Sequence, residues 1–117
     1  MSYVDGFACA VPTANKEQYL SYAKLAASVF KEHGAEQVIE CWGDDVPDGK
    51  VTSFPLAVQR KADETIVFSW IRWPSRAIRD QAWEKAMQDP RLSQEANPMP
   101  CDGKRMIYGG FEVMVEL

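Results

Sequence analysis

The 117-residue chain carries 13 basic and 17 acidic residues, a formal net charge of −4, and 46% hydrophobic residues. This length indicates one domain, residues 1–117, with enough apolar side chains to form its own core. The acidic charge and the scattered Lys and Arg residues argue against a phosphate-binding surface, so we expect no nucleic-acid partner.

The three cysteines, Cys9, Cys41 and Cys101, stand far apart and form neither a CxxC pair nor a zinc-binding spacing. The N-terminus has no signal-peptide pattern, and no stretch is apolar enough to span a membrane. We therefore expect a cytoplasmic protein with reduced thiols and no membrane partner. Cys101, in a loop flanked by prolines, is predicted to be the most exposed thiol, and the other two are predicted to pack as small apolar residues.

The first half of the chain predicts a strand, a helix and a second strand. The strands cover 3–11 and 36–43, and the helix covers 16–33. Asn15 stands where a helix N-cap is expected, and Gly34 stands where a left-handed residue ends a helix.

The second half predicts the same order again. The segment 66–73 fills both faces of a strand, and Pro74 ends it before a helix over 75–88 that Ser75 can cap. Before this strand, Pro55 reduces 51–60 to an edge or irregular strand. After the helix comes an irregular region at 91–104, with a short helical turn at 91–94, and then a last strand at 105–116.

Two strand–helix–strand halves predict an α+β fold of the ferredoxin-like split βαβ type, in which two helices cover one face of an antiparallel sheet. Strand alternation assigns Val67 and Ile71 to the helix-covered face, together with the apolar sets on the neighbouring strands. Those sets are Ile39 and Cys41, and Ile107, Phe111 and Val113. The opposite face is rich in large aromatic residues, so we expect a second copy of the chain to cover it as a homodimer about a two-fold axis.

This opposite face also predicts a small-molecule site. Its members are Arg72, Trp70, Trp42, Tyr108, Glu40 and Glu112. Two roles are open for Arg72: an ion pair with Glu40 at the dimer interface, which we favour, or an anchor for the carboxylate or phenolate of a ligand. The sequence has no nucleophile–base pair, and His33, the only histidine, is predicted to lie at a helix end. We therefore assign no catalytic residue, metal or cofactor.

Several long motifs resemble one family. They are YVDGF at 3–7, ECW at 40–42 with DDVPDGKVT at 44–52, VFSWI at 67–71, and DGKRMIYGGFE at 102–112. The sequence resembles the YbaA-like family of uncharacterised bacterial proteins (domain of unknown function 1428). The resemblance implies a ferredoxin-like fold in the dimeric α+β barrel superfamily, and it carries over no activity.

The functional expectation is therefore an uncharacterised homodimer with a small-molecule pocket between helices and sheet. The alternative is a cofactor-free oxygenase or isomerase that acts on a small aromatic or acidic compound, as in other families of this superfamily.

Overall fold

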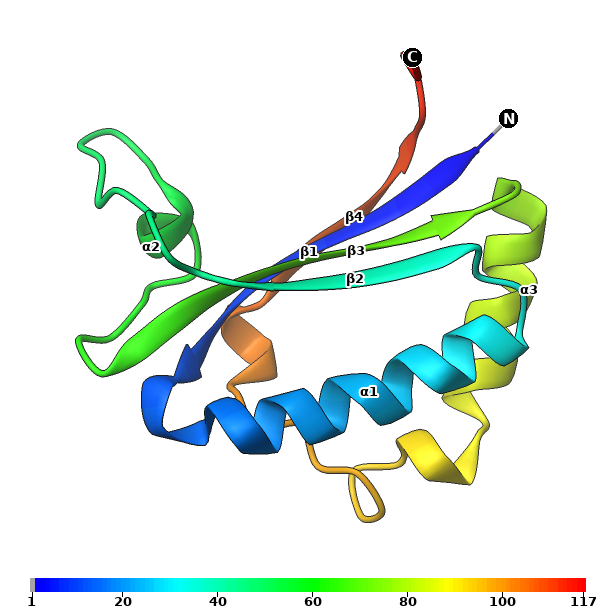
Figure 1. Cartoon of the computed structure of the whole chain (residues 1–117), viewed down its shortest axis with the longest axis horizontal. Helices are drawn as coiled ribbons and strands as arrows, with labels where there is room; N and C mark the ends of the chain where they lie inside the picture. The colour runs from blue at the N-terminus through cyan, green and yellow to red at the C-terminus, as the bar shows by residue number, and fades with distance from the viewer. Residues whose placement is uncertain (1) are drawn as a thin grey trace.

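The computed structural model, which describes residues 2–117, contains one antiparallel sheet with its two long helices on the same face (Figure 1). The strands are β1 (Tyr3–Pro12), β2 (Gln37–Trp42), β3 (Glu64–Trp73) and β4 (Ile107–Glu112), in the order β2-β3-β1-β4. The helices are α1 (Lys16–Glu32) and α3 (Arg76–Met87). The predicted α+β fold class, with two helices covering one face of an antiparallel sheet, is confirmed.

The two central strands organise the sheet. β1 and β3 pair over their whole length, from Tyr3 opposite Trp73 to Pro12 opposite Glu64. The shorter strands β2 and β4 form the two edges. Buried side chains project from β3 toward the helices: Ile71 and Trp73 pack with Val29 and Phe30 of α1, and Val67 packs in a second cluster with Tyr19 and Ala23.

The helix ends follow the sequence. The Ser75 hydroxyl accepts a hydrogen bond from the backbone N–H of Ile78 at 3.2 Å, which caps α3. His33 ends α1, and its backbone N–H donates to the carbonyls of Val29 and Phe30. Gly34 then adopts a φ of +115°, as predicted. Asn15 stands at the start of α1, but its side chain makes no capping hydrogen bond.

The predicted strand at 51–60 is wrong, because this segment contains a short helix, α2 (Phe54–Ala57). The Ser53 hydroxyl accepts from the N–H of Leu56 at 3.0 Å, and Pro55 lies in the first turn, where its missing N–H costs nothing. α2 lies on the face of the sheet opposite α1 and α3 (Figure 1).

The last strand is shorter than predicted, and residues 113–117 extend away from the body of the domain (Figure 1). The Gly109–Gly110 pair forms no bulge, since β4 stays in register with β1 from Ala8 opposite Ile107 to Tyr3 opposite Glu112. Gly110 instead allows a close approach of side chains: a Cβ there would collide with Tyr3 and Arg79.

The predicted faces of β2 and β4 are reversed in the structure. On β2, Val38 lies opposite Ile71 and Trp42 opposite Val67, so both point toward the helices. On β4, Ile107 and Phe111 point to the uncovered face. Side chains alternate strictly between the two faces of a strand, so an error in the facing of one residue reverses all the others. The prediction assigned the faces of β2 and β4 from the polarity of their own residues and therefore reversed both strands.

Candidate functional site

A cavity of about 310 Å³ lies between the helices and the sheet. We call it the inner pocket. Its walls come from α1, α3, the helix-covered face of the sheet and the segment 92–106. The lining is mainly apolar, and its aromatic members are Phe7, Tyr19, Tyr22, Phe30 and Trp83. A concave apolar site with a few polar groups is the usual form of a small-molecule site.

Glu40 of β2 is the carboxylate of the inner pocket. The Tyr19 hydroxyl donates a hydrogen bond to Oε1 of Glu40 at 2.7 Å. Glu40 lies on an edge strand and is accessible to solvent, yet desolvation of its carboxyl by the surrounding protein raises its pKa, against the hydrogen bonds from Tyr19 and Ser69. Burial also raises the pKa of Tyr19, and the nearby Glu40 carboxylate adds to this shift. The pair therefore offers a partly desolvated acceptor that substrate-sized molecules can reach.

Two thiols complete the polar part of the inner pocket. The sulfur atoms of Cys9 on β1 and Cys101 in the segment after α3 lie 4.0 Å apart. Cys9 is buried, as predicted, and Cys101 is partly buried. The expectations for the other positions are wrong: Cys41 is the exposed thiol, because β2 is an edge strand and Cys41 points to the uncovered face.

A second hollow lies on the uncovered face, which we call the open sheet face. Its large side chains are Phe54, Phe68, Trp70, Ile107 and Phe111, and Tyr108 borders it at the edge strand β4. The rings of Phe68 and Trp70 lie 5.8 Å apart, and those of Phe54 and Phe68 lie 5.6 Å apart. Phe68 and Phe111 are 41% and 61% exposed. No charged residue lines this hollow in the part of the chain that the structure describes.

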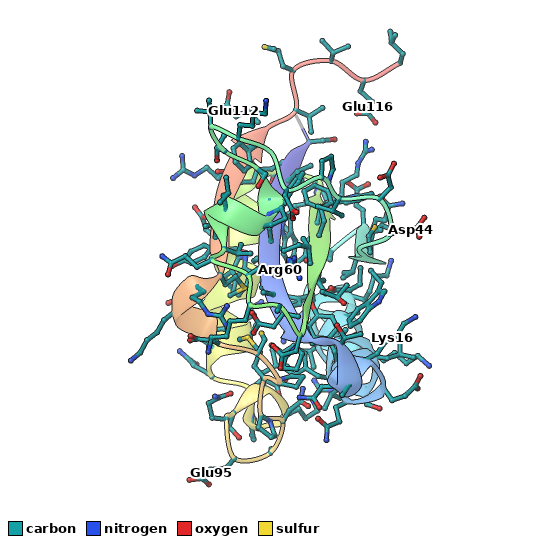
Figure 2. All side chains as sticks on the ribbon, turned by 90° about the vertical axis from the view of Figure 1, so that its left-hand side faces the viewer. Lys16, Asp44, Arg60, Glu95, Glu112 and Glu116 are labelled. Carbon is teal, nitrogen blue, oxygen red and sulfur yellow. The ribbon has the colours of Figure 1, made fainter. Side chains whose placement is uncertain are left out.

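The six residues predicted to form one site are separated in the structure. Only Glu40 lines the inner pocket, with Trp42 next to it at the sheet edge under the Lys16 ammonium, 5.3 Å from the ring centre. Trp70 lies on the open sheet face, whereas Tyr108 borders the same hollow from the edge strand β4 but stands opposite Phe7, in the set of β4 residues that alternates with Ile107 and Phe111. The two remaining residues, Arg72 and Glu112, lie at one end of the sheet, near the C-terminal tail, and Figure 2 labels Glu112 and Glu116 there.

The expected ion pair between Arg72 and Glu40 is wrong. The register of β2 and β3 sets Arg72 opposite Gln37 and Glu40 opposite Ser69, on different faces. The Arg72 guanidinium contacts Glu116 instead and lies 3.9 Å from Glu36. The role of Arg72 as a ligand anchor stays a prediction, and it lines neither the inner pocket nor the hollow of the open sheet face.

Sequence reasoning missed the polar groups that hold the walls of the inner pocket. Asp5 is 3% exposed, and it accepts hydrogen bonds from the indole N–H groups of Trp73 and Trp83 at 2.8 Å each. Nε and Nη2 of Arg79 donate to the same carboxylate, the shorter bond being 2.7 Å. The sequence did contain one signal for this group: Asp5 is an acidic residue at a position of β1 where alternation predicts a buried side chain.

Glu64 and Arg105 form the second such group. Nη1 and Nη2 of Arg105 donate to the two carboxylate oxygens of Glu64 at 2.7 Å each, and the two side chains are only 14% and 5% exposed, respectively. This ion pair ties the turn that precedes β4 to the start of β3. Neither spacing nor periodicity pointed to it, because the partners stand 41 positions apart.

None of residues 2–117 belongs to a group of three or more His, Cys, Asp or Glu side chains that could hold a metal ion. Within the same range, every helix is too short or too polar to cross a membrane.

Comparisons with known proteins agree with this fold. The family described as "Protein of unknown function (DUF1428)" matches residues 2–103. The uncharacterized protein YbaA of Escherichia coli K12 and that of Shigella flexneri are each 53% identical over 116 residues, which is 99% of both chains. The crystal structure of a mutant of SnoaB, a cofactor-independent oxygenase from Streptomyces nogalater, superposes with a TM-score of 0.57 and 16% identity, over 99% of this chain and 94% of that one. The chain therefore belongs to the DUF1428 family of proteins of unknown function.

Proposed function

We propose that the inner pocket binds a small aromatic molecule that carries a hydrogen-bond donor, such as a phenol. The observation that carries this proposal is the Glu40 carboxylate, partly desolvated and hydrogen-bonded by Tyr19, at an aromatic-walled cavity. Aromatic side chains favour stacked or edge-on contacts with a ring, and the carboxylate accepts the donor of the ligand.

The shape of the inner pocket supports a ligand of this size. Its volume of about 310 Å³ lies at the lower end of the range for small-molecule sites. The Nδ2 atom of Asn97 is buried among the lining residues without a hydrogen-bond partner, so a ligand acceptor can complete its bonding. A compact aromatic compound with one donor and one acceptor fits both polar groups.

A cofactor-free oxygenase or isomerase is the second candidate. The observation in its favour is the raised pKa of Glu40, since a general base works best when its pKa approaches the working pH. Glu40 would take the acidic proton of the bound molecule. The shared fold with SnoaB is compatible with this chemistry, but at 16% identity it supports the fold alone.

The ligand proposal predicts that 2-naphthol binds and that 2-methoxynaphthalene, which lacks the donor, binds at least about tenfold more weakly, because a hydrogen bond to a charged group contributes about 1.5–3 kcal/mol. Glu40→Gln should weaken 2-naphthol binding by a similar factor, and Ala26→Phe should abolish it by filling the cavity. Isothermal titration calorimetry measures both effects, and circular dichroism checks folding.

The matched control is Glu112→Gln, an exposed carboxylate outside the inner pocket. It should leave binding unchanged. Full-strength binding by Ala26→Phe, or a loss in Glu112→Gln alone, would move the ligand out of the inner pocket and refute the proposal. Oxygen uptake or an absorbance change of bound 2-naphthol, lost in Glu40→Gln, would favour the enzyme over the binding protein.

We further propose that the protein is a cytoplasmic homodimer in which a second copy covers the open sheet face. Its support is the group of half-exposed aromatic side chains without a charged neighbour in the hollow. Exposure of such an apolar patch to water is unfavourable. In a dimer with a two-fold axis, the same patch of each copy packs against the other and is removed from water. The tail at 113–117 adds exposed apolar side chains, Met114, Val115 and Leu117, which can reach a partner at the same side.

The dimer proposal predicts a native mass of twice the 13.2 kDa of the chain. Phe68→Glu combined with Phe111→Glu should give monomers at micromolar concentration, because four charges would lie buried in the interface without partners. Leu20→Glu, a similarly exposed position on α1, is the control and should leave the dimer intact. Sedimentation equilibrium reports the mass, and a monomeric wild-type chain would disprove the dimer.

A further inference from the structure

Two cysteines that are far apart in the sequence meet in the inner pocket. Cys9 lies in the central strand β1, and Cys101 lies 92 positions later in the irregular segment after α3. Their sulfur atoms are 4.0 Å apart, which is the separation of two thiols in hydrogen-bond contact. Both side chains line the cavity, so a small solute in the inner pocket reaches them.

The segment that carries Cys101 has few polar ties to the rest of the domain. Its hydrogen bonds run within the segment or to Pro90: the N–H of Asn97 to the Ser93 carbonyl, the N–H of Ala96 to the Ser93 hydroxyl, and the Ser93 hydroxyl to Pro90. For residues 93–101, the contact between Cys101 and Cys9 is the one polar contact to the sheet in the described chain. A movement of about 2 Å, which brings the sulfurs to bonding distance, therefore breaks no hydrogen bond with the sheet.

We propose that Cys9 and Cys101 form a peroxide-reactive thiol pair that closes to an intramolecular disulfide. The oxidant is hydrogen peroxide, and the site is the part of the inner pocket lined by Cys9 of β1 and by Cys101 of the segment 93–101.

The reaction balances in two steps. The Cys101 thiolate attacks one oxygen of hydrogen peroxide, so a sulfur–oxygen bond forms, the oxygen–oxygen bond breaks and hydroxide leaves. The Cys9 sulfur then attacks the Cys101 sulfenic acid, which forms the disulfide, breaks the sulfur–oxygen bond and releases water with the Cys9 proton. The two thiols together supply two electrons, which reduce one hydrogen peroxide to one hydroxide and one water.

The environments of the two thiols fit these different roles. Cys101 is the more accessible sulfur, and its hydrogen bond with the Cys9 sulfur lowers the pKa of Cys101. The hydrogen bond with Cys101 and burial raise the pKa of Cys9, so Cys9 starts protonated and is not the thiol that attacks the peroxide. Cys41 is exposed and points to the other face of the sheet, away from this pair.

Trypsin cleavage leaves the three cysteines in three different peptides, so mass spectrometry can identify which two cysteines are joined. The peptides end at Lys16, Lys50 and Lys104. The full-length protein is treated with a small excess of hydrogen peroxide, the remaining thiols are alkylated, and the digest is analysed by mass spectrometry without reductant. We expect the peptides that carry Cys9 and Cys101 to be joined, with a mass loss of two hydrogens, and Cys41 to be alkylated.

Variants separate the roles of the three cysteines. Cys41→Ser should leave the cross-link unchanged, and Cys101→Ser should abolish it. The cross-link should raise the melting temperature of the wild type by several degrees, and dithiothreitol should reverse this gain, because it closes a loop of more than 90 residues. Two results with the wild-type protein would overturn the proposal, whatever the variants do. One is alkylation of both Cys9 and Cys101 after peroxide treatment, and the other is that every cross-link found includes Cys41.

Discussion

Replacement of Asp5 by Ala is expected to lower the free energy of unfolding by about 3–5 kcal/mol, which is the usual loss when one partner of a buried ion pair is removed. The Asp5 carboxylate is the shared acceptor of the Trp73 and Trp83 indoles and of the Arg79 guanidinium. Without it, two indole N–H groups lose their acceptor in a largely buried place, and Arg79 keeps only the half-exposed Asp80 as a carboxylate partner. Urea denaturation, followed by tryptophan fluorescence, measures the loss.

The control for Asp5 uses the same arginine. Asp80 contacts Nη1 of Arg79 at 2.9 Å but is 52% exposed. Asp80→Ala should therefore cost no more than about 1 kcal/mol, the range for a surface ion pair. Equal losses in the two variants would show that Asp5 contributes no more than a surface charge and would contradict this account of the link between β1 and α3.

Arg105→Met is expected to lower the free energy of unfolding at neutral pH, because it leaves the Glu64 carboxylate, only 5% exposed, without its cation. The hydrogen bonds from Arg105 lower the pKa of Glu64 from 4.5 to about 2 in the folded protein. A carboxyl whose pKa falls on folding stabilises the native state above its unfolded pKa, and this contribution disappears as the pH falls from about 4.5 to about 2. The difference between wild type and variant should therefore be full above pH 5 and should shrink in acid.

Guanidinium denaturation at several pH values tests this prediction. Lys104→Met removes an exposed neighbouring charge and should change stability by less than about 0.5 kcal/mol. The double variant Glu64→Gln with Arg105→Met should recover much of the loss, since no unpaired charge remains. A difference that stays constant from pH 7 to pH 3 would rule out Glu64 as the titrating group.

Local patterns were sufficient for the four strands and the two long helices, but not for α2. The alternation at 66–73, Pro74 and the Ser75 cap placed the junction of β3 and α3 correctly, because a cap and a strand end depend on neighbouring residues. α2 was missed for a local reason: Pro55 disfavours a strand, but it also suits the first turn of a helix, and the pattern did not separate these two outcomes.

The site could not be predicted in the same way. Glu40 looked too polar for the helix-covered face, yet the Tyr19 hydroxyl, 21 positions away, satisfies its carboxylate there. Arg72 looked like its partner, but the register of β2 on β3 sends the two side chains to opposite faces. The register of two strands depends on many pairings between residues distant in the sequence, so it cannot be deduced from the sequence of one strand.

The sequence by itself determined the α+β class, the strands and helices of both halves and the family, because periodicity, caps and long motifs are properties of contiguous residues. Only the tertiary structure decided which faces meet. It brought Cys9 to Cys101, Asp5 to Arg79 and Glu64 to Arg105 across most of the chain, and it placed Glu40 with Tyr19 at the inner pocket. These contacts depend on packing between elements distant in the sequence, which the order of residues in any one element does not fix.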